Sequence, residues 1–143
     1  MPSKSPLNIV EDALAALLDA DPTLNAFTIY KGEGAEKLEL PSIIVACESA
    51  SAPEGLAQVN GNYNCRVQVA VLNNVDDNTI TTHRTATQDV MGALDSTSAV
   101  KASFATIGDA TCYDCTFSSV DAQKGDRCYI STLSYQVLIV LPA

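Results

Sequence analysis

Residues 63–71 read YNCRVQVAV, and this stretch is the clearest strand pattern in the chain. Apolar side chains stand at the odd positions and mostly polar ones at the even positions, which is the two-residue period of a strand with unlike faces. The odd face is expected to belong to the core. The even face carries Asn64, Arg66 and Gln68, and we expect it to be wet or to meet a polar subunit interface.

Further strands are expected on both sides of this stretch. Residues 42–47 are apolar or β-branched on both faces, which predicts a strand that is buried on both sides. A short apolar run at 27–30 predicts a strand that ends in a glycine-containing turn, and residues 112–120 are moderately strand-like. The last strand is expected at about 128–141. Because its end is apolar on both faces, we expect it to be central in the sheet rather than an edge.

Two helices complete the predicted elements. The first is expected at about 6–20, where Pro6 suits the first helical position and leucines recur at helical spacing until Asp21-Pro22 ends the helix. The second is expected at about 78–94, with His83 on its apolar stripe. The final third of the chain is expected to be β, apart from an ambiguous apolar run at 103–107.

This order of elements predicts an α+β fold, in which a mostly antiparallel sheet is flanked by two α-helices on one face. The length of 143 residues suits one domain with a real core, so residues 1–143 are expected to form a single domain. No apolar run approaches the roughly 20 residues of a membrane span, and no signal-peptide pattern is present. We therefore expect no membrane association.

The chain is acidic, because 17 Asp and Glu residues stand against 8 Lys and Arg residues, for a formal net charge of −9. The basic residues are scattered singly, without interleaved aromatic residues. Sequence-specific or phosphate-gripping nucleic-acid binding is therefore not expected. An acidic protein can still surround DNA if its task is to let DNA slide past without retaining it.

Catalytic and metal-binding patterns are weak in this sequence. Cys112 and Cys115 have the spacing of a zinc or redox half-site, but no second cysteine pair or histidine cluster completes a zinc ligand set. A redox pair favours a helix N-terminus, whereas this segment reads as a strand. His83 is the only histidine and is expected to be packed. We expect no catalytic residue, no metal and no cofactor; a small cytosolic thiol or metal protein using Cys112 and Cys115 is the alternative.

Over the whole chain, the order of elements resembles the tail terminator, or tail completion, proteins of the bacteriophage neck. That family typically has an amphipathic N-terminal helix, a short strand, a Leu-Pro entry into a hydrophobic strand, a long polar loop, an alternating strand, a helix and a closing C-terminal strand. Order and spacing carry the resemblance, since each motif is weak alone. The corresponding segments here are Leu7–Leu18, Ile29–Tyr30, Leu40–Val45, Glu48–Gly61, Arg66–Val69, His83–Leu94 and Tyr129–Leu141.

The resemblance implies a structural virion protein, not an enzyme, whose copies form a hexameric ring. Such a ring caps the tail tube, stops its polymerisation and joins the tail to the head-side connector, while genomic DNA passes through its lumen without specific binding. The implied partners are other copies of the chain, the tail tube protein and the connector or stopper protein. The implied location is the neck of the virion, after assembly in the bacterial cytoplasm. Another neck component, a head-tail adaptor or stopper, is the nearest alternative.

Two sets of residues are expected to make these contacts. The long polar segment 48–61 is expected to be a loop that adapts to a partner ring, because loops of this length are uncommon in compact domains and are usually functional or mobile. The residues of this loop expected to contact the tail are Ser49, Ser51, Glu54, Gln58 and Asn60. The polar strand face expected at a contact between subunits comprises Asn64, Arg66 and Gln68.

Overall fold

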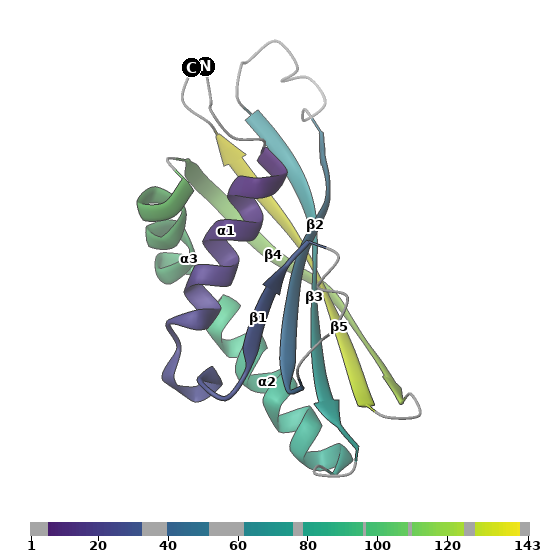
Figure 1. The fold of residues 1–143 in the computed structure, drawn as a ribbon. Helices are drawn as coiled ribbons and strands as arrows, with labels where there is room; N and C mark the ends of the chain where they lie inside the picture. Colours follow the sequence, from purple (N-terminus) through teal and green to yellow (C-terminus); the bar gives the residue numbers. More distant parts are fainter. Residues whose placement is uncertain are drawn as a thin grey trace.

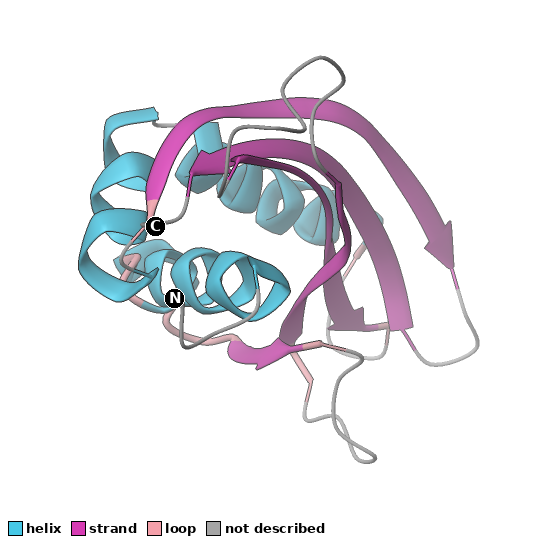
Figure 2. Cartoon of the chain, turned by 90° about the horizontal axis from the view of Figure 1, so that it is seen from above, coloured by secondary structure: helices cyan, strands magenta, loops and turns pink. Residues whose placement is uncertain are grey.

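The structure is a computed structural model that describes residues 6–32, 40–51, 62–75, 79–95, 97–108, 110–124 and 128–140. Within these ranges, five strands form one sheet in the order β1-β2-β3-β5-β4, and three α-helices accompany it (Figure 1). All three helices lie on one side of the sheet, which curves around them (Figure 2). The predicted α+β class is confirmed.

The strands are β1 (Thr28–Lys31), β2 (Ser42–Ser51), β3 (Asn62–Asn74), β4 (Thr111–Lys124) and β5 (Cys128–Val140). The pairs β2–β3, β3–β5 and β4–β5 are antiparallel, and β1 runs parallel to β2 at one edge. The sheet is therefore mostly antiparallel, as predicted. β5 lies between β3 and β4, which agrees with the central position expected from its apolar end.

The helices are α1 (Pro6–Asp19), α2 (Ile80–Asp95) and α3 (Thr97–Ser103), with a short 3-10 turn, η1 (Pro22–Leu24), and a π-helical turn, η2 (Phe104–Gly108). The prediction of two helices and an all-β final third was wrong for residues 97–108. Packing explains the difference, because Val100 and Phe104 are fully buried and the Ser103 hydroxyl donates to the Ala13 carbonyl of α1 at 2.6 Å. No helix of the described ranges is long and apolar enough to cross a membrane.

The core lies between the helices and the concave face of the sheet. The odd-numbered face of β3 belongs to it, as predicted, and the matching face of β5 continues it through Leu133, Val137 and Ile139. α1 covers this layer with one apolar stripe. Its fully buried members are Val10, Ala13, Leu14 and Leu18.

Residues 42–47 do not form a strand buried on both sides. Ile43 and Val45 are fully buried beneath the helices, whereas Ile44 and Ala46 on the opposite face are only half-buried. The physical reason is the one-sided placement of the helices, which leaves the outer face of the sheet without cover (Figure 2). Ile44 and Ala46 therefore remain partly exposed on that outer face.

Residues 48–51 belong to strand β2 and not to a loop, contrary to the prediction. A bulge between Cys47 and Ser49 shifts the register, after which Ser49 pairs with Arg66 and Ser51 with Asn64. Backbone pairing with β3 outweighs the weak strand propensity of these small residues. The Glu11 carboxylate supports the bulge, because it accepts the backbone N–H of Cys47 at 2.8 Å. The rest of the predicted loop, with Glu54, Gln58 and Asn60, lies outside the described residues.

Candidate interaction surfaces

The outer face of the sheet is the first candidate surface, and we call it the open sheet face. This face brings together residues expected in the tail-contacting loop, Ser49 and Ser51, and residues expected on the polar strand face. Ser49 pairs in register with Arg66, and the Ser51 hydroxyl donates to the Asn64 carbonyl at 3.4 Å. Arg66 is exposed, while Asn64 and Gln68 are half-buried. The open sheet face comprises Ile44, Ala46, Ser49, Ser51, Asn64, Arg66, Gln68, Asp114, Thr116, Ser134, Gln136 and Leu138.

A shallow hollow of about 240 Å³ lies on this face, across β3, β5 and β4. Its lining is Asn64, Asp114, Thr116, Gln136 and Leu138. The Thr116 hydroxyl donates to the Asp114 carboxylate at 2.9 Å, which orients both groups. The hollow therefore combines two amides and one hydroxyl with one carboxylate and the apolar Leu138, and its polar groups suit a hydrogen-bonded contact with another protein surface.

The second candidate is a surface on the helical side, formed by residues 88–95 of α2 and the hollows that flank them; we call it the α2 surface. One hollow of about 170 Å³ lies toward β4 and is lined by Gln88, Met91, Gly92, Asp95, Phe117 and Tyr135. The other, of about 320 Å³, lies toward α1 and α3 and is lined by Leu17, Ala20, Asp21, Gly92, Ala93 and Ala99. Both hollows are shallow depressions in the surface of the monomer.

Gly92 belongs to both hollows. A Cβ added to it meets no described atom within 4 Å, so packing inside the monomer does not require glycine here. A glycine inside a helix costs about 1 kcal/mol relative to alanine. The sequence shows Gly92 within the predicted helix, but the hollows depend on how α1, α2, α3 and β4 meet in space, and no pattern in the sequence indicates them.

Strand β4 forms the free edge of the sheet beside the α2 surface. Phe117 and Val120 lie on its inner side, yet they remain 38% and 45% exposed because the helices do not reach this far. Phe117 packs edge-to-face on Tyr135, with ring centroids 5.6 Å apart. Two register shifts interrupt β4, and bulges of this kind discourage uncontrolled pairing of an edge strand.

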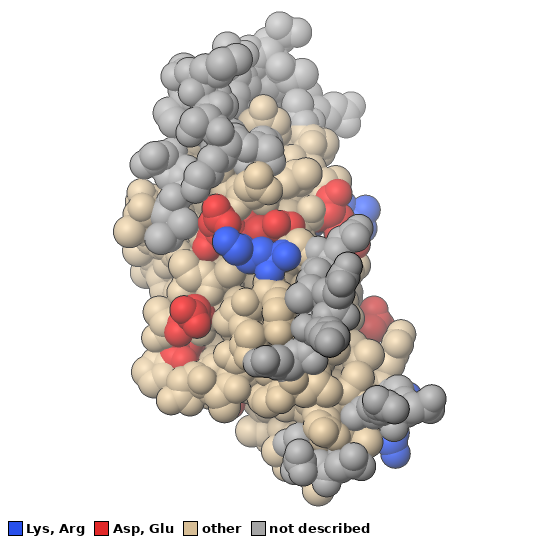
Figure 3. Space-filling model, in the orientation of Figure 1, with Lys and Arg blue, Asp and Glu red and all other residues tan. Residues whose placement is uncertain are grey.

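On the face shown in Figure 3, acidic and basic side chains gather near the middle, and other charged side chains lie singly around them. The Lys31 ammonium of β1 pairs with the Asp12 carboxylate of α1 at 2.9 Å. The exposed position of Lys31 makes this pair a weak contributor to stability. It nevertheless engages one of the few basic side chains of an acidic protein.

His83 is fully buried, as its position on the apolar stripe predicted. Its Nδ1 lies 2.7 Å from the Asn73 Oδ1 and its Nε2 lies 2.7 Å from the Ser131 Oγ, while its ring stacks on Tyr129. With the Asn73 oxygen as acceptor, Nδ1 donates and Nε2 accepts the serine hydroxyl. The hydrogen-bonded series Asn73–His83–Ser131 has the same order of groups as a serine hydrolase triad, with an amide in place of the carboxylate. Ser131 is only 2% exposed, so the trio is a packed structural network and not an active site.

We expect the stability of the protein to fall as the pH drops below 6.5. Burial, with a smaller effect of the Arg84 charge, lowers the pKa of His83 below its ordinary value of 6.5. The unfolded chain therefore takes up a proton at a higher pH than the folded protein does. The contribution of His83 to stability is complete only above the pKa of the unfolded chain, 6.5, and is lost as the pH falls below it. Urea unfolding measured across this range checks the expectation. A His83→Gln variant is the control, and an equal pH slope in the two proteins would contradict it.

The thiols of Cys112 and Cys115 are not activated, whereas the hydrogen bond with Cys47 lowers the pKa of the buried Cys65. Burial raises the pKa of Cys112, and burial raises the pKa of Cys115 to about 12. The hydrogen bond with Cys65, together with burial, raises the pKa of Cys47. In the described part of the chain, no group of three or more His, Cys, Asp or Glu residues is arranged to hold a metal ion. The raised pKa values disfavour a thiol enzyme that uses Cys112 and Cys115.

No protein-family model matches the chain, and no curated protein matches it. Solved structures do match: 24 chains are similar in fold, among them a chain of the virion of a native gene transfer agent particle. The likeness to that chain has a TM-score of 0.63 at 13% sequence identity, and it covers 91% of this chain and 93% of the other. The two chains therefore share a fold over nearly their whole lengths.

Proposed function

We propose that this chain is a structural virion protein of a tailed phage-like particle. One observation carries the proposal: the fold is shared, almost end to end, with a chain of a gene transfer agent virion. Within that class we assign the chain to the neck, as a tail terminator whose hexameric ring caps the tail tube and meets the head-side connector. The whole-chain order of elements, which resembles that family, supports the finer assignment.

The two faces of the subunit suit a ring. The helices and the open sheet face lie on opposite sides, and contacts between unlike surfaces close into rings when the rotation permits. In the proposed ring, Glu54, Gln58 and Asn60 contact the tail tube, and the net charge of −9 helps DNA to pass the lumen without being retained. A lumen lined with basic side chains would contradict this last part.

The proposal predicts that the purified protein stops the elongation of tail tubes. We expect tubes assembled in its presence to carry a ring at one end and to stop growing, as seen by negative-stain electron microscopy. Alanine at Glu54, Gln58 and Asn60 is expected to abolish capping without changing the thermal midpoint, because these side chains are assigned to the partner. Alanine at the exposed residues Thr81 and Thr85, in the first half of α2 and outside both candidate surfaces, is the control.

Two results would contradict this assignment. Tubes that elongate at an unchanged rate, with no ring at their ends, would exclude the terminator role. Binding to the purified head connector without binding to tubes would favour an adaptor or stopper instead. Capping that survives the triple alanine variant would exclude the assigned contact residues alone.

A further inference from the structure

The α2 surface has the features of a docking site. Gly92 leaves the last turn of α2 (Ile80–Asp95) without a side chain, although no described atom of the monomer occupies that space. A hollow lies on each side of it, and the half-buried Met91 and the exposed edge of Phe117 add apolar contact area. A helix that lacks a side chain in its last turn, with a hollow on each side of that position, admits the close approach of another surface.

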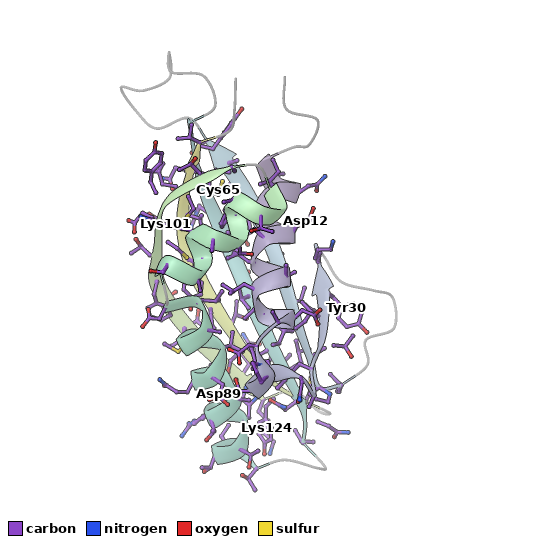
Figure 4. All side chains as sticks on the ribbon, turned by 90° about the vertical axis from the view of Figure 1, so that its left-hand side faces the viewer. Asp12, Tyr30, Cys65, Asp89, Lys101 and Lys124 are labelled. Carbon is purple, nitrogen blue, oxygen red and sulfur yellow. The ribbon has the colours of Figure 1, made fainter. Side chains whose placement is uncertain are left out.

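The charge of the α2 surface restricts what can cover it. The residues lining the two hollows include the carboxylates of Asp21 and Asp95 and no Lys or Arg. Asp89 lies on the same helix, on the side that faces the viewer in Figure 4, and is exposed. A surface that covers these carboxylates is therefore expected to bring a basic side chain among neutral groups.

The chain itself offers such a surface. Lys31 is paired with Asp12, and Arg84 and Lys101 belong to the helical side, on α2 and α3. Lys124 lies over the Tyr129 ring, 5.9 Å from its centroid. Of the basic side chains that the structure describes, this leaves Arg66, which is exposed near the middle of the open sheet face.

The open sheet face in turn lacks a cover. Ile44, Ala46 and Leu138 are half-buried there among amides and hydroxyls, and the face carries one carboxylate in its hollow toward β4, Asp114, which accepts the Thr116 hydroxyl. This composition suits a strand layer packed on both sides, and the monomer supplies helices on one side only (Figure 2). A layer of helices from another molecule would complete the packing.

We propose that the α2 surface of one copy docks on the open sheet face of a second copy, with Arg66 of the second copy near Asp95 of the first. The inference rests on the ring proposed above and assigns the contact from which that ring is built. Because the two surfaces are unlike and lie on opposite sides of the subunit, the contact is head-to-tail and each copy carries one of each.

Two variants block one surface each. Gly92→Leu places a large side chain in the last turn of α2, between the two hollows, and Arg66→Glu reverses the charge of the basic side chain on the open sheet face. We expect each to weaken self-association by about tenfold or more, as measured by sedimentation velocity and native mass spectrometry over a range of concentrations. The controls are Gly92→Ala, which adds only one methyl group to open space, and Lys124→Glu, which makes the same charge change elsewhere. Both controls are expected to assemble like the wild type.

Mixing the two blocked variants gives the decisive measurement. Gly92→Leu keeps an intact open sheet face and Arg66→Glu keeps an intact α2 surface, so the mixture is expected to form a dimer of one copy of each and nothing larger. Circular dichroism and thermal unfolding of each variant verify that the subunits are folded.

Each other outcome overturns the inference. A wild type that stays monomeric at every concentration excludes docking between free copies, and variants that assemble normally exclude these surfaces. Blocked variants that do not pair when mixed exclude the head-to-tail arrangement, and loss of assembly in Lys124→Glu alone moves the basic contact to β4. The tube-capping experiment is separate, so capping by a protein that fails here would leave the proposed function standing without this contact.

Discussion

Replacing His83 with phenylalanine is expected to lower the free energy of unfolding by about 4 kcal/mol, measured by equilibrium urea unfolding above pH 6.5. Phenylalanine keeps an aromatic ring against Tyr129, where the two rings now stack with centroids 5.6 Å apart. It removes the partner of both Asn73 and Ser131, each of which lies 2.7 Å from a ring nitrogen. A buried polar group that loses its partner costs about 1–3 kcal/mol, and here there are two.

A second variant separates the hydrogen bonds from the packing. If Asn73→Leu and Ser131→Ala are added to His83→Phe, no polar group of the trio remains, and we expect much of the lost stability to return. A loss below about 1 kcal/mol in the single variant would contradict the argument, because it would mean that Asn73 and Ser131 find other partners.

Replacing Phe104 with alanine is expected to lower the free energy of unfolding by about 4 kcal/mol, because it leaves a cavity in the core. Phe104 is fully buried, with a relative exposure of 0%. It is the largest fully buried side chain among the described residues. It opens the π-helical turn η2 and fixes that turn against the core beneath α1. Denaturant unfolding and the thermal midpoint both measure the effect.

Phe117→Ala is the matched control for Phe104→Ala, because it makes the same change at a side chain that is 38% exposed on the edge strand β4. We expect a loss of about 1 kcal/mol there, since less surface is removed from the core and solvent fills the space. Equal losses in the two variants would show that Phe104 does not hold the core as the structure implies.

The strand pattern was predicted well where burial alternates strongly. In β3 and β5 every second residue meets the helices, so the two-residue period is visible without any knowledge of the partners. The segment 97–108 was not predicted, because its helix is short, its threonine and serines have weak helix propensity, and the contacts that stabilise it come from α1. Ser49 and Ser51 were misplaced for a related reason: pairing with β3 makes them strand residues.

The candidate surfaces were predicted in part. The position of Asn64, Arg66 and Gln68 on one face follows from the same period, and the structure adds Ser49 and Ser51 to that face through register. The burial of His83 follows from the helical stripe, but its partners do not, since Ser131 is 48 residues away. The hollows beside Gly92 depend on how α2 packs against α1, α3 and β4, and local sequence patterns carry no information about this tertiary packing.

The central ladder has a consequence for the order in which the protein folds. β3 belongs to the first half of the chain and β5 to the second, and their 13-residue strands form the link that joins β1-β2-β3 to β5-β4. Closing that ladder brings together residues 62–74 and 128–140, so loop-closure entropy opposes it more than it opposes the local β4–β5 hairpin. Until it closes, each half presents a long unpaired strand edge that another chain could take up. Productive assembly therefore has to wait for the two halves of one chain to find each other first.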